Sequence, residues 1–296
     1  MKVLLAGSSG MIGQAVRIAM AAGGHDVRVL LRGGSDGPLT WDPGAGRIPP
    51  DAVEWADAII SLGGASLTKL PWMKAYKQAI LSSRVASTRV IAAAISHAAS
   101  PPAVWVSASA VGVYGNRPGE ELNEDSPRGS GFLSDVVTAW EAATAPAVAH
   151  TRVVLARTGV VLGPAGALSP LIRLARLGLG GPIGDGRQHW PWIHLDDEAR
   201  AIRHLVEASA LDGPVNLVGP VPATASDITR AVAQALHRPH IVPAPAWALR
   251  LALGDAAREL LLADQRVSPS RLRDEGVFRF EHVDAAEAVQ AVTSGS

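Results

Sequence analysis

The segment KVLLAGSSGMIGQAVRIAMAA, residues 2–22, decides the fold. Its first five residues are mostly apolar and predict a buried strand, because parallel strands covered on both faces are near-continuous apolar runs. A glycine-rich turn, residues 7–13, follows at once, and residues 11–22 then have the composition and period of a helix. A strand that leads through such a turn into a helix is typical of the opening unit of a parallel α/β sheet.

The same alternation continues along the chain. Short β-branched or leucine-rich runs predict further strands at residues 26–31, 58–62, 103–107 and 152–157. Longer stretches with helical period predict helices near residues 11–22, 72–98 and 132–148. Strands that alternate with helices predict the α/β fold class with a doubly wound parallel sheet.

Glycine and proline crowd residues 159–186, where the texture of the sequence changes. We therefore expect residues 1–160 to form the main α/β domain, with its sheet completed by residues 189–218. Residues 161–188 and 219–296 are expected to form a smaller substrate-side and C-terminal helical region.

Composition restricts the class of protein. Charged residues make up 18% of the 296 residues, below the ~25% of average globular proteins, so the chain is predicted to pack a core. Lys plus Arg and Asp plus Glu both number 27, and this zero net charge argues against a nucleic-acid or membrane partner and favours a small-molecule substrate. Cysteine is absent, so we expect a reducing, cytoplasmic location. No histidine pair has H-x-x-x-H spacing with an acid between, and no metal is expected.

Three glycines in the turn have separate roles in binding a dinucleotide. Gly7 permits the sharp turn, Gly10 lets the backbone approach a pyrophosphate at the positive helix N-terminus, and Gly13 lets the helix pack on the strand. An ordinary βα turn is the alternative, but the coincidence of this spacing with a strand–helix boundary favours binding. The predicted cofactor-binding residues here are Gly7, Ser8, Ser9, Gly10, Met11, Ile12 and Gly13.

The end of the second strand indicates which dinucleotide is bound. Enzymes that use NAD place an acid there for the ribose 2′-hydroxyl, whereas this chain has Arg32, 19 residues after Gly13. A guanidinium pairs with a 2′-phosphate, so NADP is the predicted cofactor. A solvated charge at a strand end is the alternative. The turn after the next strand should line the same crevice with Leu62, Gly63, Gly64 and Ala65.

The chain resembles the extended short-chain dehydrogenase/reductases, and within them an epimerase family with a C-terminal domain of unknown function. The resemblance covers nearly the whole chain and rests on GSSGMIG at 7–13, LGGA at 62–65, SSRVAST at 82–88, SASAVGVYG at 107–115, RTGVVLG at 157–163, GDGRQHWPWIHLDD at 184–197 and LGDAARELLLADQRVSPSRL at 253–272. It implies a Rossmann-type sheet. It also implies that Arg84 and Ser107 lie at the cofactor and that two long helices form a homodimer.

The proton-transfer pair of this superfamily is missing. Ordinary members carry Tyr-x-x-x-Lys, in which the lysine lowers the pKa of the tyrosine that moves the substrate's proton. Here Phe132 or Leu133 takes the tyrosine place and Val136 or Val137 the lysine place. The usual dyad therefore cannot operate.

Replacement acids or bases must come from other positions. Ser109 and Tyr114 are candidate catalytic hydroxyls, although a serine here equally suits a strand end. His194 is a third candidate and is also the kind of histidine that binds a backbone carbonyl. Glu124 is most simply a solvated loop charge.

Three residues are predicted to contact substrate. Lys77 can point into the crevice together with Arg84 or cover its outer rim. Trp190 stands where nucleotide-sugar enzymes have a phosphate-binding arginine, so with Trp192 it favours a flatter, less charged substrate. Core packing is the alternative for both tryptophans.

Two functions remain. The leading hypothesis is an NADP(H)-dependent oxidoreductase or epimerase-like enzyme that acts on a small carbonyl or sugar-like molecule. The alternative is a non-catalytic NADP(H)-binding sensor or regulatory protein that kept the fold after losing the dyad.

Overall fold

The computed structural model describes residues 1–33 and 39–294. They form a seven-stranded sheet in the order β11-β7-β5-β4-β1-β2-β3, in which every pair of neighbours is parallel. The strands are β1 Lys2–Ala6, β2 Asp26–Arg32, β3 Thr40–Trp41, β4 Ala58–Ser61, β5 Val104–Ala110, β7 Arg152–Thr158 and β11 Gly213–Leu217. The predicted doubly wound parallel sheet is confirmed, and β11 lies in the stretch expected to complete it.

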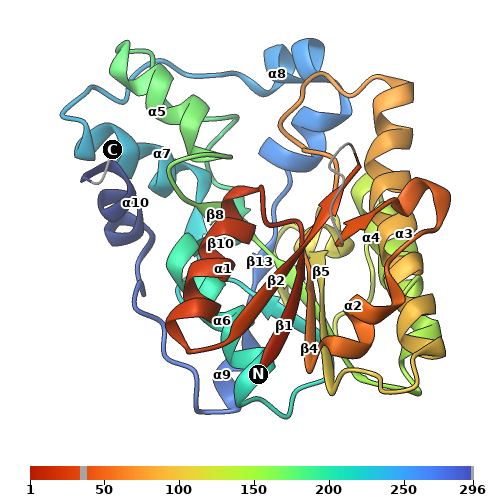
Figure 1. The fold of residues 1–296 in the computed structure, drawn as a ribbon. Coiled ribbons are helices and arrows are strands. Elements are labelled where there is room, and N and C mark those ends of the chain that lie inside the picture. The colour runs from red at the N-terminus through yellow and green to blue at the C-terminus, as the bar shows by residue number, and fades with distance from the viewer. Residues whose placement is uncertain (34–38, 295–296) are drawn as a thin grey trace.

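Helices cover both faces of this sheet (Figure 1). On one face α1, Met11–Ala22, packs beside α6, Leu195–Glu207, and on the other lie α2, Pro50–Trp55, α3, Lys74–His97, and α4, Phe132–Ala142. Successive strand residues point to opposite faces, so neighbouring residues belong to two different cores. Leu5 and Ile60 are buried on the α1 side, whereas Leu4, Ile59 and Trp105 are buried on the α3 side.

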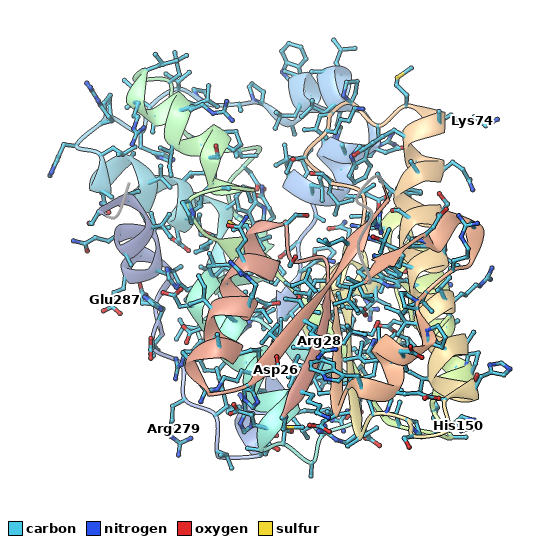
Figure 2. All side chains as sticks on the ribbon, viewed as in Figure 1. Asp26, Arg28, Lys74, His150, Arg279 and Glu287 are labelled. Atoms are coloured by element: carbon cyan, nitrogen blue, oxygen red, sulfur yellow. The ribbon has the colours of Figure 1, made fainter. Side chains whose placement is uncertain are left out.

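The C-terminal half builds a second packed region around short strand pairs. Helices α7 and α10 pack against each other, and α5 joins them at the upper left of Figure 1. The remaining elements are β6 Glu121–Leu122, β8 Val160–Leu162, α5 Leu168–Arg176, β9 His189–Trp190, β10 Trp192–His194, β12 Ala223–Thr224, α7 Ala225–Ala235, α8 Ala246–Leu253, a π-helical turn Ala257–Leu261, β13 Arg266–Val267, α9 Ser270–Asp274 and α10 Ala285–Ser294. Polar and charged side chains labelled in Figure 2, such as Lys74, His150, Arg279 and Glu287, project from the rim of the molecule.

One predicted helix is too long. The stretch 132–148 is helical only to Ala142 and continues as a 3₁₀ turn at Ala145–Ala147. Pro146 lacks an N–H and restricts the residue before it, which ends the regular helix. Helix α3 is long and apolar enough to pass a length-and-composition test for a membrane span, but Ile91 and Ile95 on it belong to the core under the sheet.

Candidate functional site

The glycine-rich turn links the end of β1 to the start of α1, and two of its glycines are required by close backbone contacts. A Cβ on Gly13 would lie 2.1 Å from the carbonyl oxygen of Gly7. Gly7 has a φ of +93°, and a Cβ there would lie 2.9 Å from the backbone nitrogen of Gly63. Gly10 is different, because the nearest atom to its Cβ would be 3.8 Å away. The helix N-terminus at Gly10 therefore keeps open space in front of it.

An outer cavity of about 600 Å³ lies in front of this turn. Its walls bring together most of the predicted cofactor-binding residues: Gly7, Ser8, Ser9, Gly10, Arg32, Leu62, Gly63 and Gly64. Arg32 is exposed, its guanidinium carbon lies 5.8 Å from the ring centre of Trp41, and a Cβ on Gly63 would lie 3.3 Å from Nη2 of Arg32. The arginine thus crosses the crevice between the ends of β2 and β4. Met11, Ile12, Gly13 and Ala65, which were also predicted to bind the cofactor, are not among the residues that line the outer cavity.

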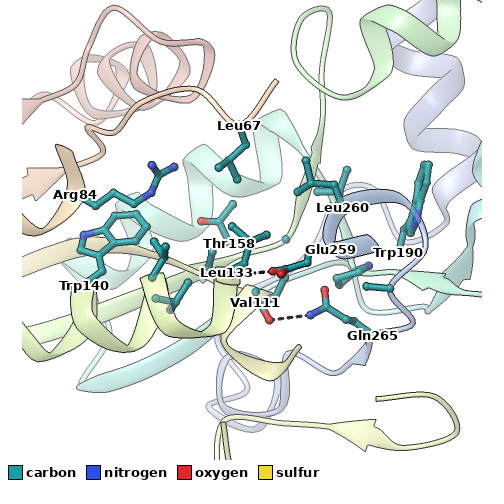
Figure 3. Close-up of a pocket in the computed structure, with 18 residues that line it drawn as sticks. Leu67, Arg84, Val111, Leu133, Trp140, Thr158, Trp190, Glu259, Leu260 and Gln265 are labelled. Atoms are coloured by element: carbon teal, nitrogen blue, oxygen red, sulfur yellow. Dashed lines mark hydrogen bonds between the residues drawn. The ribbon is translucent and has the colours of Figure 1, made fainter. Parts of the chain in front are cut away.

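An inner cavity of about 130 Å³ lies against the ends of β5 and β7 (Figure 3). Leu133 and Val137, at the tyrosine and lysine places of α4, both line it, as does Val136. Phe132 instead packs edge-on against Trp72 with 5.7 Å between ring centres. The wall that carries the proton-transfer dyad in ordinary members of the superfamily is therefore hydrocarbon in this protein.

Arg84 supplies the cation of the inner cavity. Its Nη1 donates to the carbonyl oxygens of Ala65, at 3.0 Å, and Ile80, at 3.1 Å, and its guanidinium carbon lies 5.1 Å from the ring centre of Trp140. Burial lowers the pKa of Arg84 to about 10, so the side chain stays charged at neutral pH. Figure 3 shows the guanidinium above Trp140 at one end of the cavity.

Glu259 was not predicted from the sequence and also lines the cavity. Its two carboxylate oxygens accept hydrogen bonds from the backbone N–H groups of Phe132, at 2.7 Å, and Leu133, at 2.6 Å. A carboxylate at a helix N-terminus satisfies two free donors and complements the helix dipole. No local signal could have found this contact, because the partners are more than 120 residues apart. A neighbouring cavity of about 260 Å³ extends from Glu259 to Arg250 and Arg258.

Ser109 and Tyr114 belong to a buried network behind the cavity wall. The hydroxyl of Ser109 donates to Glu141 at 2.5 Å, and that carboxylate also accepts two hydrogen bonds from Arg157, at 2.8 and 2.9 Å. The Tyr114 hydroxyl donates to Oδ1 of Asn216 at 2.8 Å and accepts from Arg157 at 3.0 Å. Burial raises the pKa of Tyr114, with Arg157 opposing the shift. Neither hydroxyl is among the groups that line the cavity.

Other predicted residues have structural partners. His194 caps α6 by accepting the N–H of Asp196, its ring stacks on His282 at 3.7 Å between centres, and burial lowers its pKa. Lys77 forms an ion pair with Asp255. Ser107 is buried on β5 and its hydroxyl lies 3.5 Å from the carbonyl oxygen of Ala108.

The two tryptophans predicted to contact substrate lie in different surroundings. Trp190 lines the inner cavity and donates its indole N–H to the carbonyl oxygen of Leu261 at 3.1 Å. Trp192 is buried in the C-terminal core, where its N–H binds the carbonyl oxygen of Val221 at 2.9 Å.

The interpretation of Glu124 as a solvated charge was wrong. Its carboxylate is buried and accepts hydrogen bonds from the N–H of Asn216, at 3.0 Å, and the hydroxyl of Ser270, at 2.5 Å. Hydrogen-bond donors from two distant segments satisfy the buried carboxylate oxygens.

Thr158 and Glu198 form a second contact that the sequence did not indicate. Thr158 ends β7 and lines the inner cavity, and its hydroxyl lies 2.7 Å from Oε1 of Glu198 on α6. Glu198 is completely buried, its Oε2 has no hydrogen-bond partner among the described residues, and burial raises its pKa to about 8. The described residues also contain no cluster of three or more potential metal ligands.

The glycine turn at the end of β1 and the cavity at the ends of β5 and β7 define a Rossmann-type protein of the extended short-chain dehydrogenase/reductase class. Residues 3–219 match the model of the NAD dependent epimerase/dehydratase family, and residues 244–292 match a domain of unknown function, DUF1731. The chain belongs to the NAD dependent epimerase/dehydratase family and carries the DUF1731 domain at its C-terminal end.

Relatives extend along the whole chain. An epimerase family protein of Mycobacterium bovis, Mb2239, is 41% identical over 99% of this chain and 97% of its own length. The human epimerase family protein SDR39U1 is 36% identical over 97% of this chain and 98% of its own length. The crystal structure of human SDR39U1 with NADPH superposes with a TM-score of 0.91 at 34% identity and covers all of both chains.

Proposed function

We propose that this protein is an NADP(H)-dependent oxidoreductase or epimerase-like enzyme that acts on a small carbonyl or sugar-like substrate without the Tyr-x-x-x-Lys dyad. The observation that carries the proposal is the adjacency of two cavities at the carboxyl ends of the strands: a Cβ on Gly64, which lines the outer cavity, would lie 3.0 Å from the guanidinium carbon of Arg84, which lines the inner one. The NADPH in the human relative's crystal structure supports the choice of cofactor.

The residues present fit such a dinucleotide. The N–H groups at the start of α1 would bind the pyrophosphate, because Gly10 leaves room for it, and Arg32 would pair with the 2′-phosphate. Arg84 would provide positive charge near the inner cavity, where the dyad's lysine is missing. When bound, the dinucleotide supplies hydride chemistry, which belongs to the cofactor.

The substrate would occupy the inner cavity and its continuation. Leu133, Val137 and Trp190 offer apolar walls that exclude water and hold a flat or apolar group. Arg250 and Arg258 in the neighbouring cavity would bind a polar end of a longer molecule. Lys77 takes no direct part in this arrangement, because it pairs with Asp255.

The non-catalytic sensor remains a second candidate, since Leu133 and Val137 at the dyad positions leave no conventional proton donor. Equilibrium fluorescence titration of the purified protein with NADPH and NADH tests the shared part of both hypotheses. Consumption of NADPH is then followed spectroscopically across a panel of aldehydes, ketones and nucleotide sugars. Turnover supports the enzyme, tight binding without turnover supports the sensor, and failure to bind either dinucleotide rejects both.

Two further expectations go with the proposal. A homodimer through α3 and α4 would show twice the chain mass in light scattering, and a constant monomer mass across concentrations would reject it. A cytoplasmic location remains a prediction that cell fractionation tests.

A further inference from the structure

Two neighbouring carboxyl groups in the first turn of α6 are equally buried and very differently partnered. Asp197 accepts hydrogen bonds from Arg200 at 2.8 Å and from the backbone N–H groups of Glu281 and His282 at 2.9 Å each. Glu198 has one partner, the hydroxyl of Thr158, and its second oxygen has none within the described chain. The carboxyl group of Glu198 therefore lacks the donors that normally stabilise a buried carboxylate.

A carboxyl group in these surroundings keeps its proton at neutral pH. Burial without a cation or several N–H donors disfavours the charged form. Its charged neighbours on α6 are engaged elsewhere, since Asp197 faces Arg200 and Asp196 is exposed beside His194. From the sheet side the core against this face of α6 is apolar apart from Thr158. Glu198 is thus a neutral acid whose single polar contact is a hydroxyl.

Thr158 also lines the inner cavity. Thr158 is the one residue with a hydroxyl among the described residues that line it. The other polar groups there are occupied: the indole N–H of Trp140 binds Thr88, Gln265 donates to two carbonyl oxygens, and Glu259 accepts two backbone N–H groups. Arg84 holds its proton too firmly to release it at neutral pH. Thr158 is therefore the available route for a proton into the cavity.

We propose that Glu198 supplies, through the hydroxyl of Thr158, the proton that the missing tyrosine provides in ordinary members of the superfamily. The proposal rests on the proposed function, because it needs a reaction in the inner cavity. Thr158 is then the catalytic residue that meets the substrate, and Glu198 is a positioning residue that acts through it.

The proton transfers balance. Hydride from a bound reduced dinucleotide would add to the carbonyl carbon and leave negative charge on the substrate oxygen, which takes the proton of Thr158 as the O–H bond of the threonine breaks. The Thr158 hydroxyl donates to Oε1 of Glu198 in this structure, so it has to turn toward the substrate for this step; its oxygen then takes the proton of Glu198, the carboxyl group becomes a carboxylate and the threonine is unchanged. After the product leaves, a proton from the solvent buffer returns to Glu198 through the Thr158 hydroxyl. In the reverse direction the carboxylate accepts the proton of an alcohol along the same path.

Infrared difference spectroscopy of the NADP⁺-loaded protein tests the proton store without requiring turnover. The wild-type protein at neutral pH should show the carbonyl stretch of a protonated carboxylic acid, and Glu198→Gln should remove it. Thr158→Val should shift that band and Thr158→Ser should restore it. Addition of 4-nitrobenzaldehyde, a small flat carbonyl probe, should shift the band in the wild type and leave it unmoved in Thr158→Val. Absence of the band, or a band that ignores both Thr158 and the probe, overturns the proposal.

Steady-state oxidation of NADPH by the same probe gives the second measurement. Since a positioned acid contributes ~10²–10⁴-fold, Glu198→Gln should lower kcat at least tenfold, leave KM and NADPH affinity unchanged, and flatten the pH profile. The exposed Glu121→Gln is the matched control and should change nothing. A Glu198→Gln protein with wild-type kcat at every pH rejects the relay. If the wild type binds NADPH and never oxidises it, the proposed enzymatic function fails, and the infrared bands still decide whether Glu198 exchanges its proton with the cavity.

Discussion

The two ends of the crevice are built in opposite ways. At the outer end, one continuous segment supplies the strand, the glycine turn and the helix N-terminus, and its requirements are backbone contacts such as the 2.1 Å that a Gly13 Cβ would leave to Gly7. At the inner end, β5, α4, β7, β9 and the C-terminal π-helical turn each contribute one wall of a small cavity.

The difference lies in what each end must do. Phosphate groups are held by N–H groups and a helix dipole, which a local motif provides by its backbone alone. A reacting group needs side chains that meet in three dimensions, and these come from distant parts of the chain. The outer end is therefore fixed by local backbone geometry. At the inner end the residue types can change without changing the fold, as the apolar Leu133 and Val137 at the dyad positions illustrate.

The largest effect is expected from Gly13→Val, which places side-chain atoms against the Gly7 carbonyl oxygen. The turn has to open, so we expect no measurable NADPH binding in fluorescence titration and a lower thermal midpoint, since overpacking typically costs ~1–3 kcal/mol and sometimes more. Gly10→Ala is the matched control, because its Cβ meets nothing closer than 3.8 Å. It should keep the wild-type thermal midpoint and lose affinity only. Equal behaviour of the two variants would contradict separate roles for these glycines.

A pH-dependent loss of stability is expected at the inner end. The pKa of Glu198 is raised from 4.5 to about 8 in the folded protein, so the folded state binds more protons than the unfolded state between these values. Stability is therefore highest below pH 4.5 with respect to this group and falls as pH rises through 8.

At about 1.4 kcal/mol per pKa unit, the shift limits the loss in the free energy of unfolding to roughly 5 kcal/mol. The helix dipole at the first turn of α6 favours the carboxylate of Glu198 by only ~0.3–1 kcal/mol. Burial, which disfavours the carboxylate, is therefore the larger effect. Urea unfolding of the wild type and Glu198→Gln at a series of pH values measures the difference between the two stability curves, which should grow as pH rises from 4.5 to 8 and level off above pH 8. Parallel curves would show that folding does not raise the pKa of Glu198.

The residues of the outer end could mostly be predicted from the sequence and those of the inner end mostly could not, because the first form a local motif and the second come from distant elements. Strand β1 and helix α1 have the predicted bounds because apolar runs and glycine spacing are local signals. The removal of the dyad was also visible, since it is a matter of residue type. The contacts of Glu259 with α4 and of Glu198 with Thr158 were not, because each joins residues on different elements. Ser109 and Tyr114 have the right residue types, yet their partners in the fold hold them in a buried network.

A smaller effect is expected from Arg32→Gln at the outer end. A charged hydrogen bond contributes ~1.5–3 kcal/mol, and because Arg32 is exposed we expect the lower limit, about a tenfold loss of NADPH affinity. NADH lacks the 2′-phosphate, so its affinity should not change. The comparison is made by fluorescence titration with both dinucleotides, and Arg176→Gln, exposed on α5, serves as control. An equal loss for NADPH and NADH would show that Arg32 does not read the 2′-phosphate.

The smallest effect is expected from Ser109→Ala. The Ser109 hydroxyl donates one hydrogen bond to Glu141, whose carboxylate keeps both hydrogen bonds from Arg157 after the substitution. We expect a loss of about 1 kcal/mol in the free energy of unfolding, the usual net value of one hydrogen bond. NADPH affinity and oxidation rate should stay at wild-type values, because the hydroxyl lies behind the cavity wall. Urea unfolding and the NADPH assay on one preparation separate the two. If oxidation stopped while NADPH still bound, Ser109 would be a catalytic residue, and the inner end would retain more of the superfamily's proton-transfer machinery than its walls indicate.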